Sequence, residues 1–197
     1  MATKFKVSFE LDEQDAKYFR SLYRAAKKNA ARVDAGEIIR DARKLVALVR
    51  ESKKVPRFVA DAISTLEDMT RIIEDDDYQA PRSVKNQVLA GLAYFSNPHD
   101  LIHDSIPALG FLDDAIMVKF VEEEFKHELW GYRKFRGFNA PSEQRPWTKV
   151  GGDRLARRTE EYRKKIRADI ATRKAADSAR RKAVRASGRK GRSLLGW

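Results

Sequence analysis

The sequence contains no cysteine, and its 197 residues include only three histidines, six prolines and ten glycines. The lack of cysteine excludes disulfide frameworks, thiolate zinc sites and cysteine nucleophiles. No stretch approaches the ~18 uncharged apolar residues of a membrane-spanning helix, and the N-terminal segment lacks the apolar core of a signal peptide. We therefore expect a cytoplasmic protein.

Common catalytic motifs are also missing. The chain has no Ser/His/Asp order typical of a triad, no P-loop, no glycine-rich dinucleotide fingerprint and no HExxH metal motif. These absences weigh against common hydrolases, nucleotide-hydrolysing enzymes and dehydrogenases. We expect a protein that is not an enzyme and that uses no cofactor, and no small-molecule substrate is indicated.

Positive charge is present in excess, and all of the excess lies at one end. The chain has 41 Lys and Arg residues against 29 Asp and Glu residues, which gives a formal net charge of +12. Residues 1–139 contain 23 basic and 23 acidic residues, whereas the last 58 residues contain 18 basic and 6 acidic ones. Any partner bound through positive charge is therefore expected on residues 140–197.

Residues 1–139 are predicted to form an all-α domain, because apolar residues recur at steps of three or four. After a short strand or extended arm at residues 4–9, the pattern predicts a bundle of about five main helices. The predicted helices follow Asp12, span Ile38 to Val49, follow Pro56, run from Pro81 to Asn97, and run from Asp113 through Tyr132. The extended arm followed by helices also allows a ribbon-helix-helix DNA reader, which the length of the first helix disfavours.

The connection between the fourth and fifth helices is rich in proline, aspartate and glycine. Its pattern resembles that of the YkvA-like family of small bacterial proteins, and the likeness extends over residues 5–135. The matching positions are Pro98, Asp100, Leu101, Ile102, Asp104, Ile106, Pro107, Gly110, Leu112, Asp113 and Asp114. His103 departs from the pattern, because the family usually has proline there. The resemblance implies a helical domain of unknown function and brings no activity with it.

We interpret the aspartates of this connection as architectural. Carboxylates accept hydrogen bonds from the first amides of a helix, proline fixes the backbone, and Gly110 allows close approach. An alternative is a divalent metal site of a hydrolase, in which the carboxylates would act together with His99 and His103. That alternative is disfavoured because neither histidine belongs to the family pattern.

Residues 140–197 are predicted to form a linker and a basic helical arm that protrudes from the bundle. Leu155, Tyr162, Ile166 and Ile170 make a narrow apolar stripe, and alanine, arginine and lysine follow it up to Ala186, before an end predicted to be flexible. Such a helix is suited to RNA or a ribosomal particle, because its cations neutralise phosphates and arginine stacks on bases. The predicted contacts are Arg154, Arg157, Arg158, Arg163, Lys164, Lys165, Arg167, Arg173, Lys174, Arg180, Arg181, Lys182 and Arg185.

Two other interpretations of the arm stay open, namely a solvated tail and a contact with an anionic membrane surface. The interrupted apolar stripe disfavours the membrane. A protein partner could in addition dock on the helical domain of residues 1–139.

Overall fold

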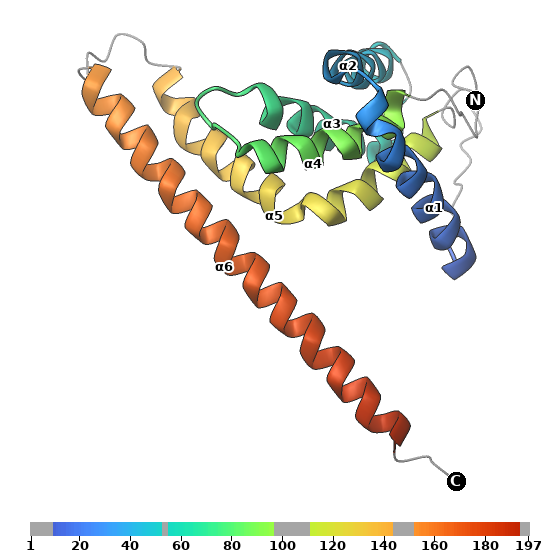
Figure 1. Ribbon diagram of the computed structural model, residues 1–197. Coiled ribbons are helices and arrows are strands. Elements are labelled where there is room, and N and C mark those ends of the chain that lie inside the picture. The colour runs from blue at the N-terminus through green and yellow to red at the C-terminus, as the bar shows by residue number, and fades with distance from the viewer. Residues whose placement is uncertain (1–9, 53–54, 97–110, 144–151, 194–197) are drawn as a thin grey trace, which may run out of the picture. The chain divides into compact units, whose positions relative to one another are not determined.

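The computed structural model of the chain describes residues 10–52, 55–96, 111–143 and 152–193, and these residues are almost entirely helical (Figure 1). No strand occurs among them, so the predicted all-α class is confirmed. The predicted extended arm at residues 4–9 lies outside the described residues. The helices are α1 (Glu13–Asn29), α2 (Ala35–Glu51), α3 (Arg57–Glu74), α4 (Arg82–Leu92), α5 (Leu112–Glu143) and α6 (Gly152–Ser193), with 3₁₀ turns η1 (Ala30–Arg32) and η2 (Ala93–Ser96).

The chain divides into two compact units. Unit 1 comprises Met1–Glu74 and Ala80–Glu124, and unit 2 comprises Asp75–Gln79 and Phe125–Trp197. The division therefore falls within α5, so that the second half of this helix belongs with α6. The predicted boundary after Asn139 concerns independent folding and stays a prediction.

Local side-chain chemistry explains where the first helices begin. Asp12 accepts hydrogen bonds from the backbone amides of Gln14 (2.6 Å) and Asp15 (2.9 Å), and the Asp15 carboxylate accepts one from the Asp12 amide, which completes a capping box. Asp34 accepts from the amide of Glu37 at the start of α2. The Pro56 carbonyl accepts from the amide of Ala60, so α3 begins immediately after the proline.

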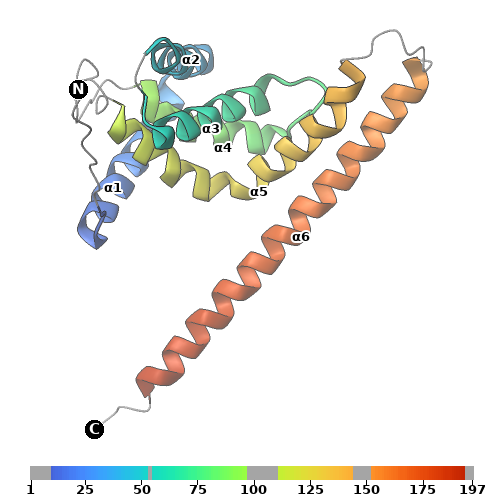
Figure 2. The same ribbon diagram turned by 180° about the vertical axis from the view of Figure 1, so that it is seen from behind.

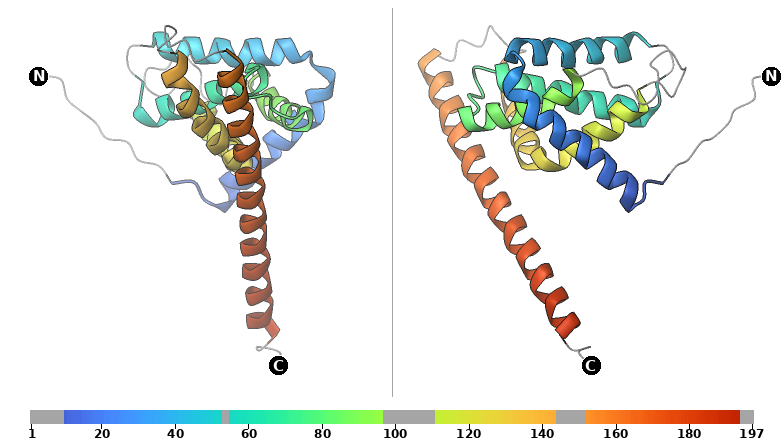
Figure 3. Two further views of the ribbon diagram at one scale, coloured as in Figure 1. Left: turned by 90° about the vertical axis from the view of Figure 1, so that its left-hand side faces the viewer. Right: turned by 45° about the vertical axis from the view of Figure 1, so that its right-hand side comes forward.

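The core of unit 1 forms where α2 packs against α3, α3 against α4 and α1 against α4 (Figures 2 and 3). The stripe predicted on α2 is buried at Ile38, Ala42, Leu45, Val46 and Val49. On α1, the ring of Phe19 stacks on Phe120 of α5 with 5.7 Å between ring centroids. The helical spacing in the sequence therefore identified the faces that meet in this core.

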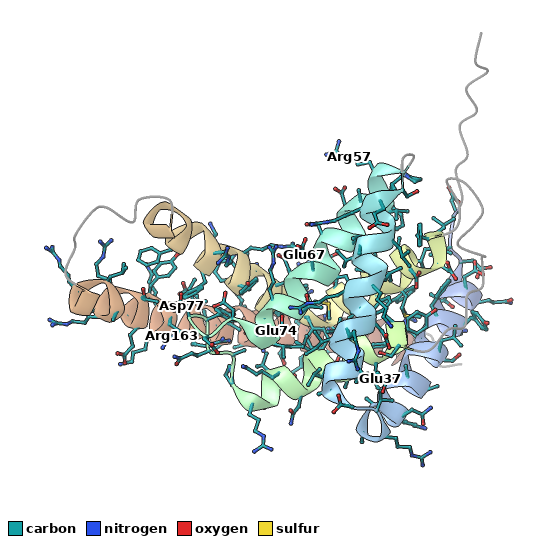
Figure 4. All side chains as sticks on the ribbon, turned by 90° about the horizontal axis from the view of Figure 1, so that it is seen from above. Glu37, Arg57, Glu67, Glu74, Asp77 and Arg163 are labelled. Atoms are coloured by element: carbon teal, nitrogen blue, oxygen red, sulfur yellow. The ribbon has the colours of Figure 1, made fainter. Side chains whose placement is uncertain are left out.

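Two ion pairs join α2 to α3, and a third lies within α3. Arg43 of α2 pairs with Glu74 of α3, and Arg50 of α2 pairs with Glu67, which also holds Arg71 (Figure 4). These groups are partly exposed, so each pair adds little to stability. Their main consequence is that these arginines are already matched by acids within unit 1.

Two predictions about the end of the bundle are wrong. Residues 139–142, expected in a linker, belong to α5, and residues 187–193, expected to be flexible, belong to α6. The physical reason for the longer α5 is tertiary packing, because its last described side chains, Phe135 and Phe138, both stack on Tyr162 of α6. Residues 187–193 include two glycines and two serines, so intrinsic helix propensity does not explain the continuation of α6.

Candidate nucleic-acid interface

The first half of α6 packs closely on the second half of α5. Ile166 and Ile170 are buried, and both lie against Gly131 of α5, which has no side chain to keep the helices apart. Glycine in the middle of a helix lowers its stability, so its presence here is explained by the close approach of the two backbones. The predicted apolar stripe of α6 is thus used within unit 2.

A buried carboxylate anchors two of the basic residues that were predicted to contact nucleic acid. The side chain of Glu128 is almost fully buried and receives Arg167, while Lys174 lies 3.9 Å away. The hydroxyl of Tyr78 donates to the same carboxylate at 2.8 Å, and the Arg167 guanidinium lies 4.3 Å from the Tyr78 ring centroid. Burial, aided by the charge of Glu128, raises the pKa of Tyr78, so its hydroxyl remains a donor across the physiological range.

Arg163 is also engaged within unit 2. It donates to the backbone carbonyl of Asp77 and to the side-chain oxygen of Gln79, both at 2.9 Å (Figure 4). Gln79 has a positive φ of 46°, which places the chain in the left-handed region at the turn that follows Tyr78. The arginine therefore holds a tight turn against α6.

Asp177 of α6 contacts α5. Its carboxylate lies 3.1 Å from Lys126, 3.4 Å from His127 and 3.3 Å from Arg181. The hydrogen bond from Lys126 is the largest of the effects that lower the pKa of Asp177. Arg173, one turn earlier, stacks over the ring of Trp130 at 4.3 Å.

The predicted cationic residues thus fall into two groups. The engaged group holds α6 to its surroundings in unit 2 or pairs along the helix, as Lys164 does with Glu160 at 2.8 Å. Its members are Arg163, Lys164, Arg167, Arg173, Lys174 and Arg181. The other predicted cations are exposed, and within the described part of the chain they form no ion pair: Arg154, Arg157, Arg158, Lys165, Arg180, Lys182 and Arg185.

We define the distal arm as residues 178–193, the part of α6 beyond Asp177. This segment contains seven basic residues and no acidic one. Arg180, Lys182 and Arg185 are exposed, and Val184, which is 64% exposed, is its large apolar side chain among those described. The α6 ribbon continues through this segment without a break (Figures 1 and 2).

Most of the family turn lies outside the described residues, namely Pro98, Asp100, Asp104, Pro107 and Gly110, as do His99 and His103. Asp113 is buried and Asp114 half-buried, and both lie in the first turn of α5, where backbone amides favour a carboxylate. Among the side chains that the structure describes, no three carboxylate or imidazole groups are placed to hold a metal ion.

Sequence reasoning missed the residues that dock α6. Glu128 and Gly131 lie on α5 and Tyr78 lies between α3 and α4, and local periodicity does not reveal that they meet α6. Gly131 was the one residue whose type hinted at docking, since a glycine inside an apolar helical pattern often has a packing reason. The consequence for the site is that the sequence alone does not separate the cations of α6 that dock the helix from those that are exposed.

The described helices define an all-α protein with a basic C-terminal helix. Comparisons with known proteins assign its family. Residues 84–120 match the family described as "Protein of unknown function (DUF1232)". The chain is 40% identical over 77 residues to "Uncharacterized membrane protein YkvA" of Bacillus subtilis (strain 168), a match that covers 38% of this chain and 71% of that protein. The chain belongs to the YkvA-like family. No solved structure matches it.

Within the described ranges, none of the helices combines the length and the apolar character needed to cross a bilayer.

Proposed function

We propose that the protein is a non-enzymatic helical scaffold or adaptor of the cytoplasm whose distal arm binds RNA, either free or in a ribosomal particle. The observation that carries the proposal is the contrast along α6. The helix is docked through Ile166, Ile170 and the engaged cations. Beyond Asp177 the segment has no acidic residue, and Arg180, Lys182 and Arg185 are exposed. Exposed lysines and arginines release condensed counterions when they meet phosphates, which favours binding to a polyanion.

The engaged cations restrict the interface. Arg167, for example, would have to give up its ion pair with the buried carboxylate of Glu128 to reach a phosphate, which is costly. The proposed phosphate contacts are therefore the distal arm and the exposed cations at the start of α6, rather than the whole helix.

An anionic membrane surface is the second candidate, favoured by the name of the Bacillus relative. A helix that lies on a membrane needs an apolar face opposite its charges. In the described part of the distal arm, that face would consist of Val184 among alanines. The chemistry of the arm therefore supports RNA more strongly.

Substitution tests the proposal more cleanly than truncation, because removing residues 140–197 would also remove the part of α6 that packs on α5. The test variant carries Arg180→Gln, Lys182→Gln and Arg185→Gln. The matched control removes the same charge from exposed cations of unit 1 that form no ion pair within the described part of the chain, through Arg24→Gln, Lys28→Gln and Arg82→Gln.

Binding of each protein is measured to a labelled ribosomal RNA fragment and, separately, to phosphatidylcholine vesicles containing phosphatidylserine, in about 150 mM salt. We expect RNA binding by the wild type and the control, and a loss of at least tenfold in the distal variant. Equal RNA affinities of the distal variant and the control would contradict the proposal. Binding to vesicles but not to RNA would replace it with the membrane function.

The scaffold part of the proposal concerns residues 1–139. Leu48 of α2 and Phe58 of α3 are 51% and 39% exposed, and they are among the large apolar side chains that unit 1 presents to solvent. They are the first residues to change in a search for a protein partner on this domain.

A further inference from the structure

Where α5 and α6 meet, stacked aromatic rings lead to an arginine, and the side chains become more exposed from one end of the stack to the other. Phe135 is fully buried and lies 6.5 Å from the ring of Tyr162 between centroids. The half-buried rings of Tyr162 and Phe138 stack at 4.0 Å with an interplanar angle of 16°. The exposed guanidinium of Arg158 lies 5.7 Å from the centroid of Phe138. The stack thus leads from the core of unit 2 to solvent.

We propose that the stack of Phe138, Tyr162 and Arg158 is a platform for an unpaired nucleobase, which deepens the proposed RNA-binding function and rests on it. Aromatic rings and the guanidinium plane of arginine both present flat, polarisable faces on which any base can stack. Phe135 packs against Tyr162 from the core, so the platform is held in place and little conformational entropy is lost when a base stacks on it.

The charges around the platform suit a single strand that enters and leaves it. Arg154 and Lys165 are exposed on α6 on either side of Arg158, and they lie about 16 Å apart along the helix. Neither forms an ion pair within the described part of the chain. Leu155, which is 37% exposed, adds an apolar contact one turn before Arg158. Of the acidic side chains that the structure describes nearby, Glu160 is paired with Lys164 and Glu161 is exposed.

The platform predicts a preference that the distal arm alone does not create. Phosphates can be contacted on single and double strands, whereas a base in a duplex is already stacked and paired and offers no free face. The platform should therefore strengthen binding of single-stranded RNA but not of a duplex of the same length, and this contribution should depend on Phe138 and Arg158.

The test uses the full chain and a single-stranded RNA of about 12 nucleotides that carries one 2-aminopurine, alone or paired with its complement. Arg158→Lys keeps the charge and removes the plane, and Phe138→Leu keeps apolar volume and removes the ring. Arg185→Lys is the matched control, because Arg185 is an exposed arginine of the same helix with no aromatic contact among the described residues.

We expect Arg158→Lys and Phe138→Leu to weaken binding of the single strand by about tenfold, the factor that one stacked base is worth, and to leave duplex binding unchanged. The 2-aminopurine fluorescence should be quenched on binding to the wild type and less quenched in these variants. Arg185→Lys should have no such effect. Because Arg158 is exposed, its variant tests the platform even if Phe138→Leu disturbs the packing of α5 on α6.

Two outcomes would overturn the platform while RNA binding itself stands. One is an equal loss on both probes, and the other is no loss on either. A wild-type chain that binds neither probe would instead refute the RNA-binding function on which the platform depends.

Discussion

Replacement of Gly131 by alanine tests the close packing of α6 on α5. An alanine Cβ at this position would lie 2.4 Å from Cδ1 and 2.8 Å from Cγ1 of Ile170, and 3.2 Å from Cγ2 of Ile166. The first two distances are shorter than real carbon contacts allow, so α6 or the Ile170 side chain must move. Both isoleucines are buried, which means that such a movement disturbs a packed interface.

Two opposing effects decide the net change in the free energy of unfolding. Alanine in the interior of a helix is favoured over glycine by about 1 kcal/mol. Overpacking a well-filled interface costs about 1–3 kcal/mol, and the 2.4 Å approach puts this case at the upper end. We therefore expect Gly131→Ala to lower the free energy of unfolding by about 2 kcal/mol.

The assay is urea unfolding followed by circular dichroism, for the wild type, Gly131→Ala, Ile170→Val and the double variant. Ile170→Val removes Cδ1, the atom nearest to the added Cβ, so the double variant should be more stable than the sum of the single effects predicts. If Gly131→Ala instead stabilises the protein by the full helix-propensity gain, the two helices do not pack at this point and the reasoning is refuted.

Two further stability predictions concern a helix cap and a buried hydroxyl. Asp12→Ala removes the capping box of α1 and should lower the melting temperature through a loss of about 1 kcal/mol, which a matched change at exposed Glu10 should not reproduce. Tyr78→Phe removes the hydrogen bond to Glu128 and should cost about 1–2 kcal/mol at pH 7. Because burial raises the pKa of Tyr78, the unfolded chain releases this proton above pH 10 while the folded chain keeps it, so the contribution of Tyr78 to stability should be constant below pH 10 and fall above it. Tyr78→Phe should make that fall less steep, and an unchanged alkaline slope would show that Tyr78 is not buried as described.

The helices of unit 1 were predictable because their signals are local. Asp12 indicates the start of α1 because its side chain can cap a helix. The three- and four-residue spacing of apolar residues from Ile38 to Val49 predicts the buried face of α2. Both signals lie within a few residues of the structure that they specify. Local signals of this kind were therefore enough to predict the all-α class and to identify the family turn.

The sequence did not predict which cations of α6 dock the helix and which are exposed. Arg167 and Arg180 stand in similar local contexts, and only the position of Glu128 on another helix makes the first a docking residue. The same holds for the end of α5, where Phe135 and Phe138 continue the helix because Tyr162 lies against them. Long-range pairing decides these cases, and helical periodicity carries no information about it.

The salt dependence of RNA binding tests the central claim most directly. Affinity of the wild type for single-stranded RNA is measured between about 50 and 200 mM salt, and each neutralised phosphate contributes about −0.7 to the slope of log K against log salt. If six to eight phosphates are neutralised, affinity should fall about a thousandfold over this range. The variant with Arg180, Lys182 and Arg185 replaced by glutamine should have a slope shallower by about 2. An affinity insensitive to salt, or a slope unchanged in the variant, would contradict RNA binding through the distal arm.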